Sequence, residues 1–314
     1  MKEPLIILAG PTAVGKTKLS IDLAKAVGGE IISADSMQVY KHMDIGSAKI
    51  RPSQMQGVRH YLVDELEPWE EFHVVRFQQM AKQAMKEIRE RRHIPILVGG
   101  TGFYIQAIVR DIDFTENEAG PYRRELERLV EEKGSVYLYE ELQRVDPESA
   151  ERIHENNVKR MIRALEFYRI TGEKISKHNE EQRKKRSPYN FAYFVLNDDR
   201  AKLYARIEKR IDEMLEEGLV KEVLHLKEMG CVREMVSMQG LGYKEILAYL
   251  DGEYTLEEAV GILKQDTRRF AKRQLTWFRR EQEVIWLNKE AYAYDEEKLL
   301  ASMLKILREK EIIK

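Results

Sequence analysis

The sequence predicts an α/β protein in which a doubly wound parallel sheet carries an inserted all-helical subdomain. Three observations lead to this prediction. Short apolar runs without alternation occur at residues 5–9, 30–34 and 94–98, and helical patterns follow these runs. Residues 121–172 are highly charged and helical in pattern, without a convincing strand. Continuous apolar strands joined through helices are typical of a parallel sheet that is covered on both faces.

The first half of the sheet is predicted in chain order. The run at 5–9 is too short for a helix and ends at a Gly-Pro turn signal, which indicates a buried strand. A helix is expected over residues 16–27, and the run at 30–34 is the second strand. A helix with apolar spacing over 74–91 leads into the third strand at 94–98.

Two further strands are predicted after the helical segment. Residues 191–196 and 284–287 are apolar runs, and the basic stretch at 183–188 is expected to be an exposed link. We therefore expect a core made of residues 1–112 plus 191–314, and a helical insertion at 113–190.

Composition excludes several classes of protein. The chain has 314 residues, of which 43% are hydrophobic and 34% charged, as in an ordinary globular protein. No apolar stretch of about 18 residues and no signal peptide is evident, so we expect a cytoplasmic protein without a membrane partner. Cys231 is the only cysteine, which excludes a disulfide framework and a zinc ribbon.

The net charge of −1 conceals a local basic segment. Residues 267–280 contain six basic side chains and no acidic one. On a helical wheel these six fall within an arc of about 140°, outside which lie three aromatic residues. Such a cationic face suits the backbone of a nucleic acid, although a solvated face is the alternative. Its members are Arg268, Arg269, Lys272, Arg273, Arg279 and Arg280.

A phosphate-binding loop lies between the first strand and the first helix. The segment fits G-x-x-x-x-G-K-[ST], whose backbone N–H groups converge on phosphate oxygens at a helix N-terminus. Its lysine would neutralise a phosphate and its last hydroxyl would ligate Mg²⁺, so the sheet is expected to be of the P-loop NTPase type. The loop consists of Gly10, Pro11, Thr12, Ala13, Val14, Gly15, Lys16 and Thr17.

Two polar residues end neighbouring strands at the edge where open α/β sheets bind ligands. Asp35 follows the second strand and suits a Mg²⁺ ligand, a general base or a helix cap. Thr101 follows the third strand, where it is either a site residue or the N-cap of a helix over 102–109.

Two further groups of cations have alternative interpretations. Arg206 and Arg210 lie one turn apart on the helix after the insertion, and they suit either a diphosphate or a surface pair with Glu213. In the insertion, an apolar stripe formed by Val158, Met161, Ile162 and Leu165 defines a helix. Beside that stripe are three cations, which suit either nucleic acid or solvent: Lys159, Arg160 and Arg163.

These motifs together resemble the tRNA dimethylallyltransferase (tRNA isopentenyltransferase) family over nearly the whole chain. The specific matches are S-A-D-S-M-Q-V-Y at 33–40 and K-R-Q-L-T-W-F-R at 272–279. M-D-I-G at 43–46, G-G-T-G at 99–102 and G-Y at 242–243 also match. Ser47 departs from the expected threonine, and Tyr61 stands where a second histidine is common.

The resemblance implies transfer of a dimethylallyl group from dimethylallyl diphosphate to N6 of the adenine next to the anticodon, position 37, with Mg²⁺ as cofactor. Asp35 would be the general base, and Thr101, Lys16 and Arg206 would assist catalysis. The phosphate loop and Arg210 would hold the diphosphate. We expect a monomer that contacts the tRNA anticodon stem-loop partly through the insertion. The expected tRNA contacts are Asp35, Ser36, Met37, Gln38, Thr101, Arg123, Lys159, Arg160, Met161, Ile162, Arg163, Gln239, Gly240, Leu241, Gly242, Tyr243, Lys244, Lys272 and Arg273.

Two other functions are compatible with parts of the sequence. A small-molecule kinase would use the same loop and sheet, with Asp35 as Mg²⁺ ligand or base, but it leaves the basic helix unexplained. A non-catalytic RNA-binding or NTP-switch protein accounts for the basic faces, but not for an aspartate opposite the phosphate loop.

Overall fold

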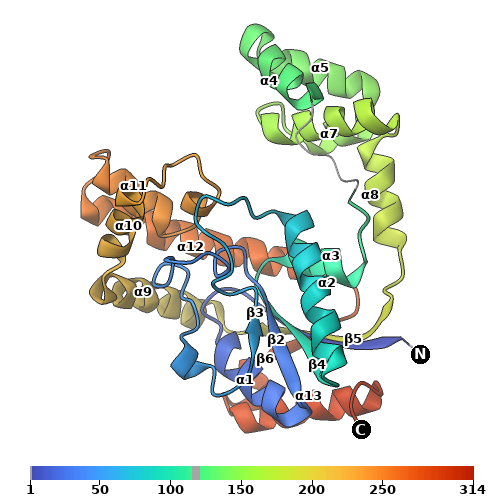
Figure 1. The fold of residues 1–314 in the computed structure, drawn as a ribbon, viewed down its shortest axis with the longest axis vertical. Helices are drawn as coiled ribbons and strands as arrows, with labels where there is room; N and C mark the ends of the chain where they lie inside the picture. Colours follow the sequence, from blue (N-terminus) through green and yellow to red (C-terminus); the bar gives the residue numbers. More distant parts are fainter. Residues whose placement is uncertain (1, 115–120) are drawn as a thin grey trace. The chain divides into compact units, whose positions relative to one another are not determined.

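The computed structural model describes residues 2–114 and 121–314, which form two compact units (Figure 1). The sheet unit comprises Met1–Val109 and Pro188–Lys314, and the helical unit comprises Arg110–Ser187. Each boundary lies three residues before the one predicted, because the chain leaves the sheet unit where a helix ends at Val109. Residues 115–120 of the predicted insertion lie outside the described residues.

Six parallel strands form the sheet in the order β3-β2-β4-β1-β5-β6. All five predicted strands are confirmed, and the chain winds first to one side of β1 and then to the other. No apolar run predicted β3, which is only two residues long. The strands are β1 (Glu3–Ala9), β2 (Gly29–Ala34), β3 (His60–Tyr61), β4 (Ile94–Gly99), β5 (Tyr189–Asn197) and β6 (Val284–Asn288).

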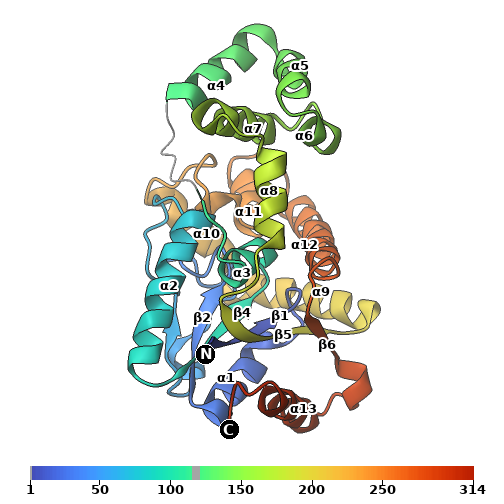
Figure 2. The ribbon, with the colours of Figure 1, turned by 90° about the vertical axis from the view of Figure 1, so that its right-hand side faces the viewer.

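Helices cover both faces of this sheet (Figures 1 and 2). On one face α1 (Lys16–Val27) packs against β1, β2 and β4, with α13 (Glu296–Glu309) beside it on β5. On the other face α2 (Val74–Glu90) and α3 (Gly102–Val109) pack on β2 and β4. The remaining long helices of the sheet unit are α9 (Arg200–Glu217), α10 (Leu219–Glu228), α11 (Tyr243–Leu250) and α12 (Leu256–Phe278). Single 3₁₀ turns occur at Pro52–Gln54, Ser237–Gln239 and Lys289–Tyr292. No helix in the described part of the chain is long and apolar enough to cross a membrane.

The helical unit has its own hydrophobic core, as expected for an inserted subdomain. Asp146 is buried and accepts hydrogen bonds from the backbone and hydroxyl of both Ser149 and Ser176, which ties α6 to α8. The predicted exposed link at 183–188 is wrong in part, because α8 extends to Lys184 and Ser187 is buried. The helices are α4 (Pro121–Lys133), α5 (Ser135–Val145), α6 (Pro147–Arg152), α7 (Val158–Thr171) and α8 (Ile175–Lys184).

The register of the sheet brings three strand ends to the same level. Ala34 of β2 pairs with Gly99 of β4, and Gly99 in turn pairs with Ala9 of β1. The backbones approach closely here, since a Cβ on Gly99 would lie 2.2 Å from the Ala34 carbonyl oxygen. The residues that follow these ends therefore emerge next to one another at the carboxyl edge of the sheet.

A buried ion network lies at the opposite end of β2. The carboxylate of Glu30 accepts from Arg91 Nε at 3.0 Å and Nη2 at 2.8 Å, contacts His93 Nδ1 at 2.5 Å and accepts from Tyr61 Oη at 3.1 Å. Burial raises the pKa of Glu30, but these partners outweigh it and hold that pKa at about 2. The Glu30 carboxylate therefore stabilises the folded sheet while it is ionised.

We predict that Glu30→Gln lowers the free energy of unfolding by about 2 kcal/mol at neutral pH, allowing for solvent screening. A carboxyl whose folded pKa is depressed contributes stability above its usual value of 4.5, and that contribution is lost as the pH falls toward 2. Denaturant unfolding should thus show the variant and the wild type converging as the pH falls from about 5 to about 2. Glu216→Gln, at an exposed position of α9, is the control and should match the wild type throughout. A difference in the free energy of unfolding between Glu30→Gln and the wild type that does not change with pH would contradict the low pKa assigned to Glu30.

Candidate functional site

The phosphate-binding loop connects β1 to α1 at the carboxyl edge of the sheet. Two of its residues have left-handed backbone: Ala13 at φ 60° and Gly15 at φ 97°. Such a conformation costs a non-glycine residue free energy, so the surrounding structure must hold Ala13 in place. The first turn of α1 begins at Lys16, which leaves its unpaired N–H groups and the positive end of the helix dipole facing the loop.

Lys16 points into the loop, and its Nζ donates to the carbonyls of Gly10 at 2.9 Å and Pro11 at 2.8 Å. Burial lowers the pKa of Lys16 to about 8, Asp35 opposes this shift and the charge of Arg210 adds to it. An anion bound in the loop would favour the protonated form. The arrangement therefore suits a multiply charged anion such as a diphosphate.

The two arginines of α9 have different roles in the structure. Arg206 donates from Nε to the Ala13 carbonyl at 3.0 Å and from Nη2 to the buried carboxylate of Asp198 at 2.5 Å. Its guanidinium thus supports the left-handed residue of the loop. Arg210 makes no ion pair with any described residue, and although burial lowers its pKa, the charge of Asp35 raises it. Arg210 is therefore the better placed of the two to bind an anion.

Asp35 combines two of the interpretations given above. Its Oδ1 accepts from the backbone N–H of Met37 at 2.8 Å and of Gln38 at 3.4 Å, so it caps the turn after β2. Its Oδ2 has no hydrogen-bond partner among the described residues. The charge of Asp35 acts on Lys16 and Arg210, which places this carboxylate opposite the phosphate loop.

Thr101 lies beside Asp35, because its backbone N–H donates to the Ala34 carbonyl at 3.2 Å. The Thr101 carbonyl accepts from Tyr104 N and Ile105 N, which begins α3. Thr101 thus caps the helix through its backbone, while its hydroxyl makes no hydrogen bond within the described residues. A site role for the hydroxyl is compatible with this geometry.

Gln274 of α12 was missed as a site residue, although it lies within the K-R-Q-L-T-W-F-R segment. Its Oε1 accepts from the backbone N–H of Thr12 at 2.9 Å, and its Nε2 donates to the Gly100 carbonyl at 3.0 Å. The side chain is buried, and the indole of Trp277 packs nearby against Gly102. Only the unusual glutamine within a basic, aromatic helix could have indicated it.

Lys289 is a second missed residue. It follows β6, and its Nζ lies 3.4 Å from the position that a Cβ on Gly15 would occupy. It makes no ion pair in the described part of the chain, so its ammonium adds an uncompensated charge at the loop. Nothing in the sequence indicates this contact, because a single lysine after a strand is an ordinary surface residue.

Five of the expected tRNA contacts have buried positions: Met161, Ile162, Gly240, Gly242 and Tyr243. Met161 and Ile162 belong to the core of the helical unit. Gly242 is buried, and Tyr243 donates from its hydroxyl to Glu222 at 2.8 Å while it accepts from Ser47 N at 3.1 Å. These residues pack within the protein, and their contact with RNA stays a prediction.

Several other expected contacts are held by intramolecular bonds. Gln38 accepts from Ser33 Oγ at 3.2 Å and donates to the carbonyls of Ser47 and Ala48. Gln239 donates to the Arg233 carbonyl, and Lys244 is paired with Asp266 at 3.2 Å. In the helical unit Arg123 is paired with Glu166 at 2.8 Å. The remaining expected contacts at this edge are partly exposed: Ser36, Met37 and Leu241.

The basic arc of α12 is only partly available to a ligand. Arg268 is paired with Glu208 of α9, and Arg269 with Asp266 at 3.3 Å. The expectation of a wholly cationic face is therefore wrong at its N-terminal end. The exposed cations of the segment are Lys272, Arg273, Arg279 and Arg280, and those of α7 are Lys159, Arg160 and Arg163.

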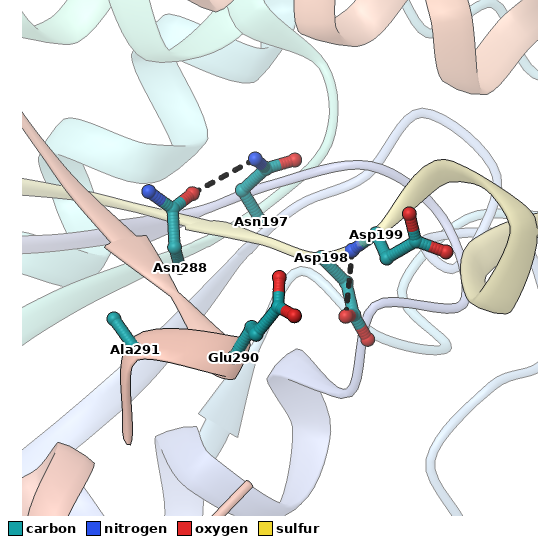
Figure 3. Close-up of a pocket in the computed structure, with 6 residues that line it drawn as sticks. All are labelled: Asn197, Asp198, Asp199, Asn288, Glu290 and Ala291. Atoms are coloured by element: carbon teal, nitrogen blue, oxygen red, sulfur yellow. Dashed lines mark hydrogen bonds between the residues drawn. The ribbon is translucent and has the colours of Figure 1, made fainter. Parts of the chain in front are cut away.

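A hollow of about 480 Å³ lies at the carboxyl ends of β5 and β6 (Figure 3). Asn197 donates to Asn288 across it, and carboxylates at Asp198, Asp199 and Glu290 line it. Because none of its lining residues is a cation, the hollow does not suit a diphosphate. The phosphate loop, with its N–H groups and lysines, is the better anion site.

We predict that Lys289→Met weakens binding of inorganic diphosphate about fivefold, since the lost charge is worth about 1 kcal/mol at a partly exposed site. Isothermal titration calorimetry at low salt measures the change. Lys298→Met, on the exposed face of α13, is the matched control and should leave binding unchanged. Equal affinities of the two variants would show that the Lys289 ammonium does not reach the anion.

Comparison with known proteins finds relatives over nearly the whole chain. The family model described as IPP transferase matches residues 38–281. A tRNA dimethylallyltransferase of Lachnoclostridium phytofermentans is 65% identical over 313 residues, covering 99% of this chain and all of the relative. One from Acetivibrio thermocellus is 52% identical and covers 94% of each chain.

Solved structures give the same result. The full-length tRNA isopentenylpyrophosphate transferase of Bacillus halodurans has a TM-score of 0.74 at 44% identity, covering 99% of this chain and 98% of its own. A eukaryotic dimethylallyltransferase acting on tRNA has a TM-score of 0.80 at 31% identity, covering 91% of this chain and 74% of its own. The chain belongs to the IPP transferase family, whose members include the tRNA dimethylallyltransferases.

Proposed function

We propose that the protein transfers a dimethylallyl group from dimethylallyl diphosphate to N6 of adenine 37, next to the anticodon of tRNA, and releases diphosphate. One observation carries the proposal: the register of β1, β2 and β4 brings a phosphate loop, a carboxylate and a threonine to one edge of the sheet. An anion-binding loop opposite a carboxylate suits a reaction in which a diphosphate leaves as a proton is removed. The relatives are named for this activity.

The donor would lie with its diphosphate in the loop. The N–H groups at the start of α1 and the ammonium of Lys16 face the leaving group, and Arg210 and Lys289 add charge from two other elements. Negative charge gathers on the diphosphate as the C1–O bond breaks, so groups fixed around it stabilise the transition state more than the ground state. Arg206 contributes indirectly by holding Ala13.

The residues at the loop fit Mg²⁺. Thr17 in the first turn of α1 would supply a hydroxyl, and Mg²⁺ accepts few protein ligands when substrate phosphates and water complete its shell. No group of three or more His, Cys, Asp or Glu side chains suited to a metal occurs within residues 2–114 and 121–314, so most ligands would come from the diphosphate and water. When bound, the ion supplies positive charge to the phosphate oxygens.

Asp35 would act on the acceptor. The adenine amine is a poor nucleophile because its lone pair is delocalised into the ring. While Oδ1 is held by the turn after β2, Oδ2 is available to take a proton from N6 as the bond from N6 to C1 forms. The C1–O bond breaks, the diphosphate leaves with its electron pair, and the N6 proton goes to Asp35. Thr101, adjacent to Asp35, is placed to orient the base.

The RNA would be bound by exposed cations. Lys272 and Arg273 of α12 suit phosphates of the anticodon stem-loop, and the cations of α7 suit the same RNA from the helical unit. The adenine must leave its stack to reach Asp35, as in other enzymes that modify a base. We propose that the protein acts as a monomer.

One experiment tests the function as a whole. The protein is mixed with Mg²⁺, labelled dimethylallyl diphosphate and unmodified tRNA, and label in the RNA is measured. Transfer of label that requires both substrates is expected. Hydrolysis of ATP with no labelled RNA would instead indicate a small-molecule kinase, and RNA binding with no transfer would indicate a binding protein.

We predict that Asp35→Asn lowers kcat by roughly two to four orders of magnitude, because it removes the base. The amide oxygen of asparagine still accepts from Met37 N, so the variant keeps the cap and separates the two roles. Asp35→Ala should be equally inactive and slightly less stable, since it loses the cap as well. Single-turnover rates at saturating substrates, with melting temperatures, check this. An active Asp35→Asn variant would mean that the residue is only a cap.

We predict that a Lys272→Gln/Arg273→Gln variant binds tRNA more weakly and flattens the log–log salt dependence of binding by up to about one unit for each lost phosphate contact. Donor affinity should be nearly unchanged. Lys298→Gln/Lys305→Gln on α13 makes the same change in net charge at exposed positions away from α12 and serves as the control. Filter binding from low to moderate salt measures the slope. An unaltered slope would identify this part of α12 as a solvated face.

A further inference from the structure

Gln274 makes two hydrogen bonds that join the two sides of the site. The residue belongs to α12, far in sequence from both of its partners. Thr12 N must donate and the Gly100 carbonyl must accept, so the partners themselves determine which end of the amide is oxygen and which is nitrogen. A buried side chain with both ends of its amide bonded to backbone has a single orientation.

The contact with Gly100 depends on the absence of a side chain there. A Cβ on Gly100 would lie 2.2 Å from Gln274 Nε2, closer than real atoms approach. The amide therefore lies directly against the backbone at the end of β4.

The two partners lie on the two sides of the site, one that would hold the donor and one that would hold the acceptor of the proposed reaction. Thr12 is in the loop that would hold the diphosphate, and Gly100 precedes Thr101, which lies beside Asp35. We propose that Gln274 is a positioning residue that fixes the distance between the donor loop and the acceptor side of the site. This inference rests on the proposed function. It assigns Gln274 no contact with either substrate.

The loop has a physical need for such support. Ala13 is left-handed, and the Ala13 carbonyl is already held by Arg206. Gln274 accepts from the N–H of the preceding residue, Thr12, so the peptide groups on the two sides of the Thr12–Ala13 peptide are fixed from α12 and α9. The rate of transfer falls steeply when reacting atoms are misplaced by about 1 Å. The two hydrogen bonds of Gln274, here called the clamp, are therefore important for transfer rather than for binding alone.

Gln274→Glu gives the sharpest test, because protonation of the introduced carboxyl decides whether both hydrogen bonds of the clamp form. An ionised carboxylate accepts from Thr12 N but opposes the Gly100 carbonyl. A protonated carboxyl accepts with one oxygen and donates with the other, as the amide does. Burial raises the pKa of such a group, so lowering the pH should restore the clamp. Gln274→Met has similar size and no polar atom, so the pH cannot restore it.

The measurement is the single-turnover rate with both substrates saturating, from about pH 5.5 to pH 8. Each rate is divided by the wild-type rate at the same pH, which removes the pH dependence of the wild-type reaction. At pH 8 we expect both variants to be about ten- to a hundredfold slower than the wild type, with the KM for tRNA unchanged. As the pH falls, the relative rate of Gln274→Glu should rise severalfold, and that of Gln274→Met should stay constant.

Gln265→Met, at an exposed position of the same helix, is the matched control and should equal the wild type. A wild-type rate for Gln274→Met, or pH profiles of the two variants that coincide, would overturn the inference. So would a failure of both variants to fold, measured by thermal melting, because Gln274 would then be a core residue. An inactive wild type would refute the proposed function instead, so the two failures are distinguishable.

Discussion

The close pairing of three parallel strands at their carboxyl ends is the constraint on which the site depends. Because Ala9, Gly99 and Ala34 share one level and neighbouring strands lie about 4.8 Å apart, the chain leaves all three strands within about 10 Å. The phosphate loop, the Gly-Gly-Thr segment and Asp35 are those departures. A shift of one residue in either pairing would separate the carboxylate from the loop, and it would also turn buried side chains of the strand toward the wrong face.

Around this edge the protein uses side chains to fix backbone rather than to meet ligands. Arg206 and Gln274 each bind a peptide group of the loop, and Glu222 accepts from the N–H groups of Asp44, Ile45 and Gly46. These residues come from α9, α12 and α10. Three helices that follow β5 in the chain therefore hold the backbone of the site in place. This division explains why Arg206, rather than Arg210, has a buried carboxylate as its partner.

The sequence allowed the strands, the loop and the fold class to be predicted, because these depend on local patterns. The apolar runs of β1, β2 and β4 and the glycine spacing of the loop are visible in single segments. Contacts between distant segments left no such signal. Gln274 is an ordinary polar residue until α12 lies against Thr12, and Lys289 is an ordinary lysine until β6 ends near Gly15. The buried Tyr243 was likewise expected at RNA because its burial depends on Glu222 and Ser47, which lie far away in the chain.

The helical unit has a hydrophobic core that is separate from that of the sheet unit, with Asp146 as its polar tie. Two cores in one chain need not melt together, so the free energy of unfolding of the sheet unit, to which Glu30 belongs, is then distinct from that of the helical unit. Substitutions in the smaller core would therefore act on the helical unit and on the exposed cations of α7, rather than on the packing of the anion site.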